Sequence, residues 1–375
     1  MEGLRCISGT CSLPDVIIKP LEPGVRLWSD PKSWEDKYGV GKLPGEGDEV
    51  EIPSGWNMLL DLKETPIFKS LTINGRLSFI QDGTDIHLQS KKIFVRAGEF
   101  FIGSETKPFE SKATITLHGM QKEETLVLRG TVSAGNKILA TTGDVFFYGK
   151  KRSLHTRLIA PVYKGFTEIL VEPYLDWVKG DQIYLAPTAL QHTHSEYRTI
   201  VSYVGNKITL DKPLNYYHWG ADQSTADKYN GVDMRGEVRL LSRNILVKGD
   251  PADSWGGQIL VTDIFEDDGS WRKGQLIFDY VQVYNCSQED TFKAAIRWEG
   301  AIGGTSRVSN SAVHGSLAWL ASVYKSNNVE LTSSTFVGSR AIGVHTDLVR
   351  NFKMTNNFVG DVSDRIFSGD MKVDK

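Results

Sequence analysis

The chain has 375 residues, of which 40% are hydrophobic and 24% charged, enough for two or three domains with substantial cores. Its formal net charge of −3 argues against nucleic acid as the main partner. The sequence contains no apolar run of about 18 residues and opens on no signal peptide, so we expect membrane contact only through parts of a longer parent protein outside this chain.

The first 25 residues are predicted to be an N-terminal extension. Cys6 and Cys11 are placed to close a small disulfide loop there, although so short a loop adds little stability. The third cysteine, Cys286, then has no partner in the chain. Three cysteines do not decide between a reducing and an oxidising compartment.

A short helix is expected from Asp30 to Gly39, and a glycine-rich stretch, "GVGKLPG", overlaps its end at 39–45. This stretch does not fit a phosphate-binding loop, because Leu43 stands where that loop needs Ser or Thr and acidic residues follow. We predict instead that the glycines turn the chain into a strand from Glu49 to Ile52 and out again. The glycines involved are Gly45, Gly47 and Gly55.

Alternation of apolar and polar residues, broken by glycine, predicts strand after strand from Val25 to Tyr148 and again from 151 to 250. The last third repeats itself: "SNSAVHG", "SSTFVG" and "TNNFVG" end on Gly315, Gly338 and Gly360, which are 23 and 22 residues apart. Such a period, with Asn and Ser turns, is typical of a parallel β-helix. Val313, Phe336 and Phe358 are then expected to stack in one column, and the stacked Asn and Ser to bond along the helix.

Several of these segments together resemble a G8 domain. They include Trp28, "SW" at 33–34, "LPGEGDEVEIPSG", "LTINGRLSF", "AGEFFIGSETKPF" and "ATITLHG". The counterparts of the eight glycines that name the domain are Gly41, Gly45, Gly47, Gly55, Gly75, Gly98, Gly103 and Gly119. The later segments "GDQIYLAPT", "ITLDKPLNYYHWG" and "EVRLLSRNI" are similar to the stretch that joins a G8 domain to a right-handed parallel β-helix.

This organisation is that of fibrocystin-like surface proteins and of the cell-migration-inducing, hyaluronan-depolymerising family. The resemblance implies an all-β fold, in which a G8 sheet module at 26–150 packs on a right-handed parallel β-helix at 151–375 that continues beyond the chain. It also implies an extracellular or cell-surface setting. The implied partners are a glycan or matrix polysaccharide, or other surface proteins. No residue pattern demands a cofactor, and Ca²⁺ is the candidate that the resemblance implies.

Two polar clusters are candidate sites. His192 and His194, with Glu196, share one face if they lie on a strand, where they can hold a metal; the alternative is a polar loop. The second cluster is Asp233, Arg235, Glu237, Arg239 and Arg243. Its guanidiniums can bind the carboxylates of an anionic polysaccharide, or pair with neighbouring acidic residues. As catalytic residues we consider Glu196, Glu237 and Asp233, and as substrate-binding residues Arg198, Arg235, Arg239 and Trp298.

A third set is expected to line one flank of the β-helix: Arg297, Trp298, Glu299, Arg307, His314, Trp319, His345, Asp347 and Arg350. Glu299 with Asp347, two coils apart, or Asp267 with Asp268, can supply the carboxylates that glycan hydrolysis needs, but no spacing singles out a pair. Trp298 and Trp319 can stack on sugars or fill the core. The triplet Asn285-Cys286-Ser287 is a possible glycosylation site.

The sequence leaves two candidate functions. The first is a non-catalytic glycan-binding or structural adhesion module of a large surface protein. The alternative is a polysaccharide depolymerase of the hyaluronan-degrading kind, with its site between His192 and Arg243 facing the first coils of the β-helix.

Overall fold

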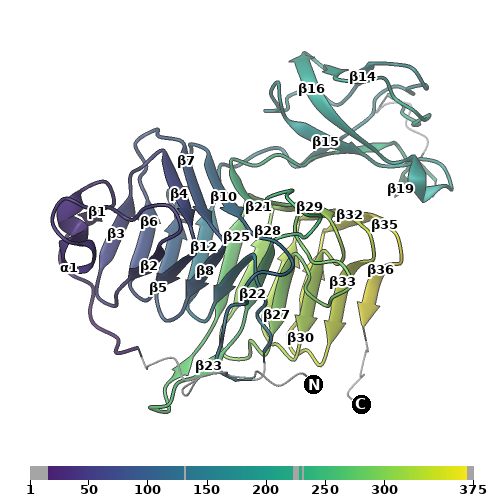
Figure 1. Cartoon of the computed structure of the whole chain (residues 1–375). Helices are drawn as coiled ribbons and strands as arrows, with labels where there is room; N and C mark the ends of the chain where they lie inside the picture. The colour runs from purple at the N-terminus through teal and green to yellow at the C-terminus, as the bar shows by residue number, and fades with distance from the viewer. Residues whose placement is uncertain (1–15, 131, 223–227, 230–231, 370–375) are drawn as a thin grey trace.

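The structure is a computed structural model that describes residues 16–130, 132–222, 228–229 and 232–369. Nearly all of its regular structure is β, and a parallel β-helix runs along most of the chain (Figure 1). The predicted fold class is therefore confirmed. The helices of the described residues are short: η1 (Pro31–Trp34), α1 (Glu35–Tyr38) and η2 (His192–His194). Asp30 caps η1 by accepting a hydrogen bond from the backbone N–H of Lys32.

Three long parallel sheets form the β-helix, and successive strands enter sheets A, C and B in turn. Sheet A has nine strands in the order β1 (Arg26–Leu27), β3 (Asn57–Leu60), β6 (Arg76–Phe79), β9 (Glu99–Ile102), β12 (Asp144–Tyr148), β25 (Gln275–Asp279), β28 (Ser306–Ser309), β31 (Val329–Thr332) and β34 (Lys353–Thr355).

Sheet C has eight strands in the order β35 (Phe358–Val362), β32 (Thr335–Ser339), β29 (Ala312–Ser316), β26 (Val281–Tyr284), β21 (Ile245–Gly249), β10 (Ala113–Leu117), β7 (Ile86–Ser90) and β4 (Glu64–Phe68). Sheet B has nine in the order β2 (Glu49–Ile52), β5 (Ser70–Ile73), β8 (Lys92–Val95), β11 (Ile138–Thr141), β22 (Gln258–Val261), β27 (Ile296–Glu299), β30 (Ala321–Tyr324), β33 (Ile342–Asp347) and β36 (Arg365–Gly369).

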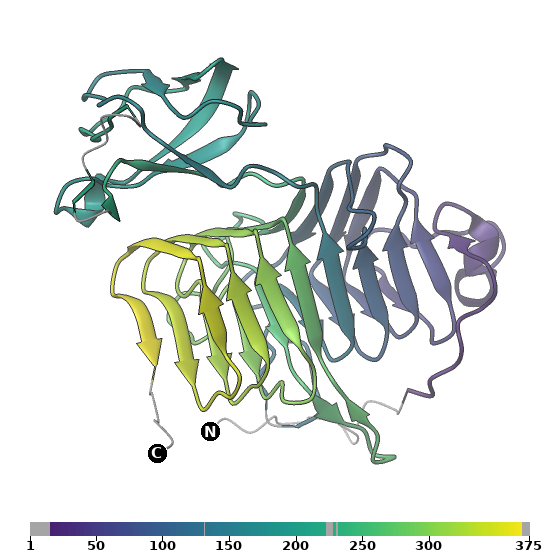
Figure 2. The ribbon, with the colours of Figure 1, turned by 180° about the vertical axis from the view of Figure 1, so that it is seen from behind.

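Strand pairing runs across residue 150, where the sequence analysis placed a domain boundary. β10 pairs in parallel with β21, β11 with β22, and β12 with β25. The strands of residues 26–148 are thus the first coils of the same β-helix that continues from 245 to 369, as the uninterrupted row of strands in Figure 2 shows. The physical reason is that both parts present matching open edges, which satisfy their backbone hydrogen bonds by pairing.

An antiparallel domain is inserted where the chain passes from β12 in sheet A to β21 in sheet C. Its six strands lie in the order β13 (His155–Arg157), β20 (Glu237–Leu240), β15 (Gln182–Leu185), β16 (Glu196–Val204), β17 (Lys207–Leu210) and β14 (Glu168–Leu170). It projects from the β-helix on the side of β29, β32 and β35 (Figure 1). It has a hydrophobic core of its own, so this part of the predicted 151–375 β-helix is a separate antiparallel unit.

Two small hairpins complete the described structure. One pairs β18 (Lys228–Tyr229) with β19 (Val232–Asp233) inside the inserted domain. The other pairs β23 (Ile264–Phe265) with β24 (Trp271–Arg272) where the chain passes from sheet B back to sheet A.

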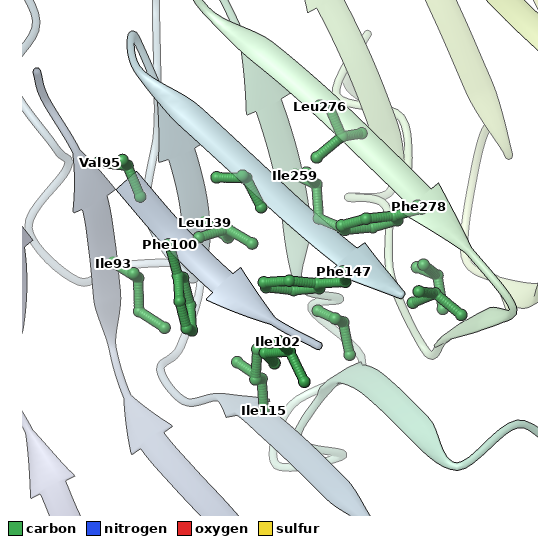
Figure 3. Close-up of a cluster of buried hydrophobic side chains, with 14 of the residues drawn as sticks. Ile93, Val95, Phe100, Ile102, Ile115, Leu139, Phe147, Ile259, Leu276 and Phe278 are labelled. Carbon is green, nitrogen blue, oxygen red and sulfur yellow. The ribbon is translucent and has the colours of Figure 1, made fainter. Parts of the chain in front are cut away.

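The interior of the β-helix is a continuous hydrophobic column (Figure 3). Inward-facing rings contact each other from coil to coil. Phe100 and Phe147 meet edge to face with centroids 4.9 Å apart, and Phe147 and Phe278 stack with centroids 5.1 Å apart. Each buried aromatic side chain removes a large apolar surface from water. This column explains the alternation in the sequence, because every second residue of each strand points into it.

The C-terminal repeat has a period of 23 residues. Val313 pairs with Phe336, and Phe336 pairs with Val359. The predicted column that ended at Phe358 was therefore wrong by one residue at its last position. Alignment of the repeats by residue type matches "NFVG" to "TFVG" and so places Phe358 opposite Phe336. Strand register instead places Phe358 opposite Thr335 and Val359 opposite Phe336.

The same shift changes the column of glycines. The register places Asp361, and not Gly360, at the position after Gly315 and Gly338. Gly315, Gly338 and Asp361 have φ of 62°, 72° and 51°, all in the left-handed region. An acidic residue thus occupies a backbone position at which Asp is tolerated better than most residues.

Stacked Asn and Ser side chains do bond from coil to coil, as predicted. Asn351 Nδ2 donates to Asn328 Oδ1 at 2.9 Å. The backbone N–H of Ser311 donates to Ser334 Oγ at 3.1 Å, and that of Ser334 to Asn357 Oδ1 at 2.9 Å. The last two bonds satisfy backbone donors at the turns, where strand pairing does not reach.

The glycine-rich stretch near residue 45 is a turn, as predicted. The strand that follows, β2, has the predicted bounds. Gly47 and Gly55 have φ of 76° and 92°. The acids pair locally: Asp48 Oδ2 accepts a hydrogen bond from the N–H of Gly45, and Glu46 Oε2 accepts one from Ile67.

Candidate functional site

The predicted catalytic residue Glu196 is buried inside the inserted domain, and its side chain is 1% exposed. Its carboxylate accepts hydrogen bonds from the guanidinium of Arg198 and from the backbone N–H groups of Asn215 and Tyr216. The Nε2 of His218, also buried, lies 3.1 Å from Oε1. A carboxylate so fully bonded and shielded from water is suited to holding strands together.

The predicted substrate-binding residue Arg198 belongs to the same network. Its remaining donors bond to the backbone carbonyls of Tyr197, Lys212 and Pro213. The guanidinium therefore ties β16 to the segment after β17.

Four of the five residues of the second predicted cluster pair with each other: Arg235 with Asp233, and Arg239 with Glu237. Arg235 donates to Asp233 at 2.7 Å and to Glu172 at 2.9 Å, and this hydrogen-bonded guanidinium lowers the pKa of Asp233 to about 2. Arg239 pairs with Glu237, and its guanidinium lies 4.7 Å from the ring centroid of Phe358 in the β-helix. Charges that are already paired leave few free groups for a ligand.

His192 and His194 lie on η2 and not on a strand. The ring of His194 stacks on Tyr216 with centroids 4.0 Å apart. Among the described residues, no group of three His, Cys, Asp or Glu side chains is arranged to hold a metal ion. The predicted histidine pair therefore lacks a third ligand of these types in this part of the chain.

Trp298 is 0% exposed and fills the interior of the β-helix, so it cannot stack on a sugar in this structure. Asn285 has both amide hydrogens engaged, since Nδ2 donates to the carbonyls of Gly249 and Asp250, at 3.0 and 3.2 Å. Glycosylation at this nitrogen remains a prediction and requires at least one of these bonds to be lost. Cys6 and Cys11 lie outside the described residues.

Several of the flank residues do meet, on the outer face of sheet B. The strands β27, β30 and β33 are neighbours, and their register aligns Arg297 with Ser322 and His345. The next outward-facing row aligns Glu299 with Tyr324 and Asp347. Of the other flank candidates, Arg307 lies on sheet A and His314 on sheet C.

These two rows form part of a groove of about 380 Å³, which we call the sheet B groove. It is lined by Phe292, Arg297, Glu299, Trp319, Ser322, Tyr324 and His345. Phe292 is 77% exposed, its ring lies 5.5 Å from that of Trp319, and the ring of Trp319 lies 4.9 Å from that of His345. The sequence reasoning missed Phe292 and Tyr324, which stand in no recognisable motif.

The polar groups of the sheet B groove are held in place. Arg297 donates to Glu299 at 2.6 Å and to the carbonyl of Ser133 at 2.9 Å. Burial lowers the pKa of Arg297. Fixed carboxylates beside aromatic rings can accept hydrogen bonds from hydroxyl groups while the rings pack on apolar C–H faces.

A second cavity, of about 320 Å³, lies between the inserted domain and sheet C, and we call it the junction pocket. It is lined by Gln182, Tyr197, Arg198, Thr199, Asp211, Leu241, Tyr284, His314, Gly315, Gly338 and Asp361. Tyr197 donates a hydrogen bond to Asp361 across it, at 2.6 Å. The inserted domain therefore faces sheet C at β26, β29, β32 and β35, which are coils of the predicted 151–375 β-helix.

Residues 33–159 match the G8 domain family. The chain is 34% identical to mouse fibrocystin-L over 254 residues, which are 66% of this chain and 6% of that protein. It is 36% identical to human fibrocystin-L over 242 residues, or 63% of this chain and 5% of that protein. With canine fibrocystin it shares 26% identity over 372 residues, 94% of this chain and 8% of that protein. The chain thus contains a G8 domain, resembles fibrocystin-like proteins, and spans a small part of their length.

Among solved structures, the tailspike protein gp49 from Pseudomonas phage LKA1 is 13% identical, with a TM-score of 0.23 over 73% of this chain and 44% of that chain. The Gp54 tailspike of Acinetobacter baumannii bacteriophage AP22, in complex with a capsular saccharide, is 9% identical, with a TM-score of 0.24 over 87% of this chain and 57% of that one. TM-scores this low support no functional comparison. No helix in the described residues is long and apolar enough to cross a membrane.

Proposed function

We propose that this chain is a non-catalytic, glycan-binding module of a large extracellular or cell-surface protein, and that the sheet B groove holds the glycan. The extracellular setting rests on the resemblance to fibrocystin-like proteins. Other surface proteins remain the alternative partners of such a module.

The observation that carries the proposal is the composition of the sheet B groove. Phe292, Trp319 and Tyr324 present aromatic surface beside Glu299 and the hydroxyl of Ser322. Sugars offer one apolar C–H face and a rim of hydroxyls, so aromatic rings next to fixed hydrogen-bond acceptors suit them. The parallel strands repeat these positions about every 4.8 Å along the β-helix, which suits an extended chain.

A non-catalytic role is favoured by the state of the predicted catalytic residues. Glu196 is enclosed and fully bonded, and Glu237 and Asp233 are each paired with a neighbouring arginine. A general acid or base must reach the glycosidic bond or its water. Each of these three carboxylates is already bonded to protein groups, so none is free to act on the glycosidic bond of a long polysaccharide.

Trp319→Ala tests the binding proposal. We expect the full chain to bind at least one glycan on a mixed array of neutral and anionic glycans. In calorimetry with that glycan, Trp319→Ala should weaken binding by about tenfold or more, equivalent to about 1.4 kcal/mol. Trp271→Ala is the matched control, because Trp271 is a partly exposed tryptophan on the β23–β24 hairpin, outside the groove. Failure to bind any glycan, or equal affinity of the Trp319→Ala protein, would contradict the proposal.

One observation favours the depolymerase as a second candidate. Glu299 and Asp347 lie in the same outward-facing row with Tyr324 between them. Two strand spacings place their backbones about 9–10 Å apart, close to the upper end of the range of about 6.5–9.5 Å between the carboxyl groups of inverting glycosidases. This pair was one of those that the sequence suggested.

Size analysis of glycans after incubation separates the two functions. We expect hyaluronan and neutral polysaccharides to keep their length, with Ca²⁺ or with EDTA. If fragments appear, and Glu299→Gln or Asp347→Asn abolishes them while Glu330→Gln does not, the chain is a depolymerase. Glu330 is the matched control because it is an outward-facing glutamate on sheet A, with similar partial exposure.

A further inference from the structure

The junction pocket, the cavity of about 320 Å³ between the inserted domain and sheet C, is built by both parts of the fold. Tyr197 and Asp211 come from the inserted domain, on β16 and directly after β17. Tyr284 and His314 come from β26 and β29 of the β-helix. The volume is at the lower end of the range of about 300–1,000 Å³ for small-molecule sites, so the pocket suits a small ligand. The sheet B groove shares none of its residues.

Two glycines make room for aromatic rings on the β-helix side of the junction pocket. A Cβ added to Gly315 would lie 2.7 Å from Cε2 of Tyr284, and one added to Gly338 would lie 2.7 Å from the hydroxyl oxygen of Tyr197. These distances are far inside the optimal contact of about 3.5–4.0 Å, so any side chain there would displace the tyrosines. The two tyrosines are 41% and 40% exposed, so each keeps apolar surface that a ligand can cover.

Two carboxylates line the junction pocket, one from each part of the fold. Asp211 Oδ1 accepts a hydrogen bond from the backbone N–H of Thr199 at 2.8 Å, and Asp361 Oδ2 accepts one from the hydroxyl of Tyr197 at 2.6 Å. Within the described part of the chain, neither aspartate forms an ion pair with Lys or Arg, and the second oxygen of each accepts no hydrogen bond. Each carboxylate can therefore accept a hydrogen bond from a ligand.

His314 adds a hydrogen-bond donor to the same pocket. The backbone N–H of Arg243 donates to Gln282 Oε1, so the amide nitrogen of Gln282 faces His314 Nε2, at 2.8 Å. An amide nitrogen only donates, so Nε2 is the acceptor and the neutral ring carries its proton on Nδ1. Burial, then the charge of Arg243, lowers the pKa of His314 to about 3 and keeps the ring neutral.

The Nδ1–H of His314 has room for an acceptor supplied by a ligand. The side chain is 3% exposed and lines the pocket, and none of the residues that the structure describes accepts a hydrogen bond from Nδ1. A buried N–H without an acceptor costs free energy, so a ligand that accepts from it is favoured. The ligand must therefore both donate and accept hydrogen bonds.

We propose that the junction pocket binds one neutral sugar unit, as a free monosaccharide or as the terminal unit of a glycan. Sugar hydroxyls both donate and accept, so they can donate to Asp211 and Asp361 and accept from His314, while C–H faces pack on the tyrosines. A cation matches the carboxylates but leaves the histidine donor without an acceptor. An anion meets two like charges, and the guanidinium of Arg198 in the pocket is already bonded to Glu196.

The test titrates the Trp319→Ala chain, in which the sheet B groove is disabled, with the methyl glycosides of glucose, galactose, mannose, fucose and N-acetylglucosamine. Binding is followed by ligand-observed NMR, with methyl glucuronide as the anionic probe and agmatine as the cationic probe. We expect at least one neutral glycoside to bind saturably, and more tightly than either probe. A hexasaccharide that ends in the same sugar separates the two sources: similar affinity indicates a terminal unit, and much weaker binding indicates a free monosaccharide.

Adding Asp361→Gly should weaken this binding by at least about tenfold, because it removes one of the two carboxylates. Glycine holds the same left-handed position in the two preceding coils, at Gly315 and Gly338, so the substitution keeps the backbone unstrained. Asp211→Ala, on the other side of the pocket, should weaken binding to a similar extent. Asp364→Ala is the matched control, at an exposed aspartate outside the pocket, and should leave the affinity unchanged.

The proposal is overturned if no neutral glycoside binds, if agmatine or methyl glucuronide binds more tightly than every neutral glycoside, or if Asp361→Gly or Asp211→Ala keeps the parent affinity. The two sites fail separately. Glycan binding by the unmodified chain that survives Trp319→Ala and is lost with Asp361→Gly contradicts the sheet B groove and supports the junction pocket, and the reverse result does the opposite.

Discussion

The β-helix and the inserted antiparallel domain are built from similar sequence patterns, yet they use their polar residues differently. In the β-helix, outward-facing rows such as Arg297–Ser322–His345 repeat from strand to strand and line an open groove. In the inserted domain, the most conspicuous polar residues, Glu196 and Arg198, are turned inward and bonded to one another.

The difference follows from size. The β-helix has a long hydrophobic interior that supplies its stability, so its outer rows are left for other roles. The inserted domain has a much smaller core and adds a buried ionic network to hold its strands. A cluster of His, Glu and Arg in a small domain is thus a weaker sign of catalysis than the same residues along a solenoid face.

Glu196→Ala has the largest expected effect, and it tests whether the buried ionic network holds the inserted domain together. It leaves the guanidinium of Arg198 and the buried ring of His218 without their carboxylate partner, at a cost of about 3–5 kcal/mol. Hydrogen exchange should rise in β15, β16 and β17, while β28 and β31 remain protected. Glu168→Ala is the control, since its pair with Lys207 is about half exposed and worth about 0.2–1 kcal/mol. Equal effects of the two substitutions would show that the network does not hold the domain.

Acid should weaken the side of the β-helix that the inserted domain covers. His314 lies on β29 with its Nε2 2.8 Å from the amide nitrogen of Gln282, and burial, then the charge of Arg243, lowers the pKa of His314 to about 3. The imidazole of His314 is therefore protonated more readily in the unfolded chain than in the folded chain. Stability from this group is complete above the ordinary histidine pKa of about 6.5 and falls by about 1.4 kcal/mol per unit as pH drops toward 3.

Urea unfolding between pH 4 and pH 7 measures this effect. His314→Gln should flatten the pH dependence, and His192→Gln, at an exposed histidine of η2, should leave it unchanged. An equally steep pH dependence in the His314→Gln protein would assign the acid sensitivity to other groups.

A smaller effect is expected at the first turn of the β-helix. Gly47 has a φ of 76°, and no heavy atom lies within 4 Å of the position of an added Cβ. Gly47→Val should therefore cost roughly 1–3 kcal/mol through backbone strain alone. Gly45→Ala, at a glycine without a left-handed φ, is the control. Thermal unfolding measures both, and a rise of the melting temperature with ATP that Gly47→Val removes would revive the phosphate-loop interpretation.

The smallest predicted effect concerns the contact between the two regions. Tyr197→Phe removes the hydrogen bond to Asp361, worth about 0.5–1.5 kcal/mol. Protection of β35 against hydrogen exchange should fall slightly, whereas Tyr163→Phe, at an exposed tyrosine of the same domain, should change nothing. If β35 is unaffected, the two regions do not stabilise each other through this bond.

The sequence by itself determined the β-helix, the C-terminal repeat to within one residue, and the turn before β2. It could do so because strand alternation, stacked Asn and Ser, and left-handed glycines are local requirements of the backbone, written into neighbouring residues. The sequence also placed Arg297, Glu299, Trp319 and His345 among the side chains expected to line one flank of the β-helix, and these four line the sheet B groove.

Only the tertiary structure decided which polar residues are free. Alternation is the same in a parallel coil and in an antiparallel insertion, so the sequence did not separate residues 155–240 from the β-helix. It also could not show that Trp298 points inward while its neighbours on β27 point outward, nor that Phe101 meets Phe146 across two strands. Strand register brings together residues that are far apart in the chain, and register is fixed by the packing of the whole interior.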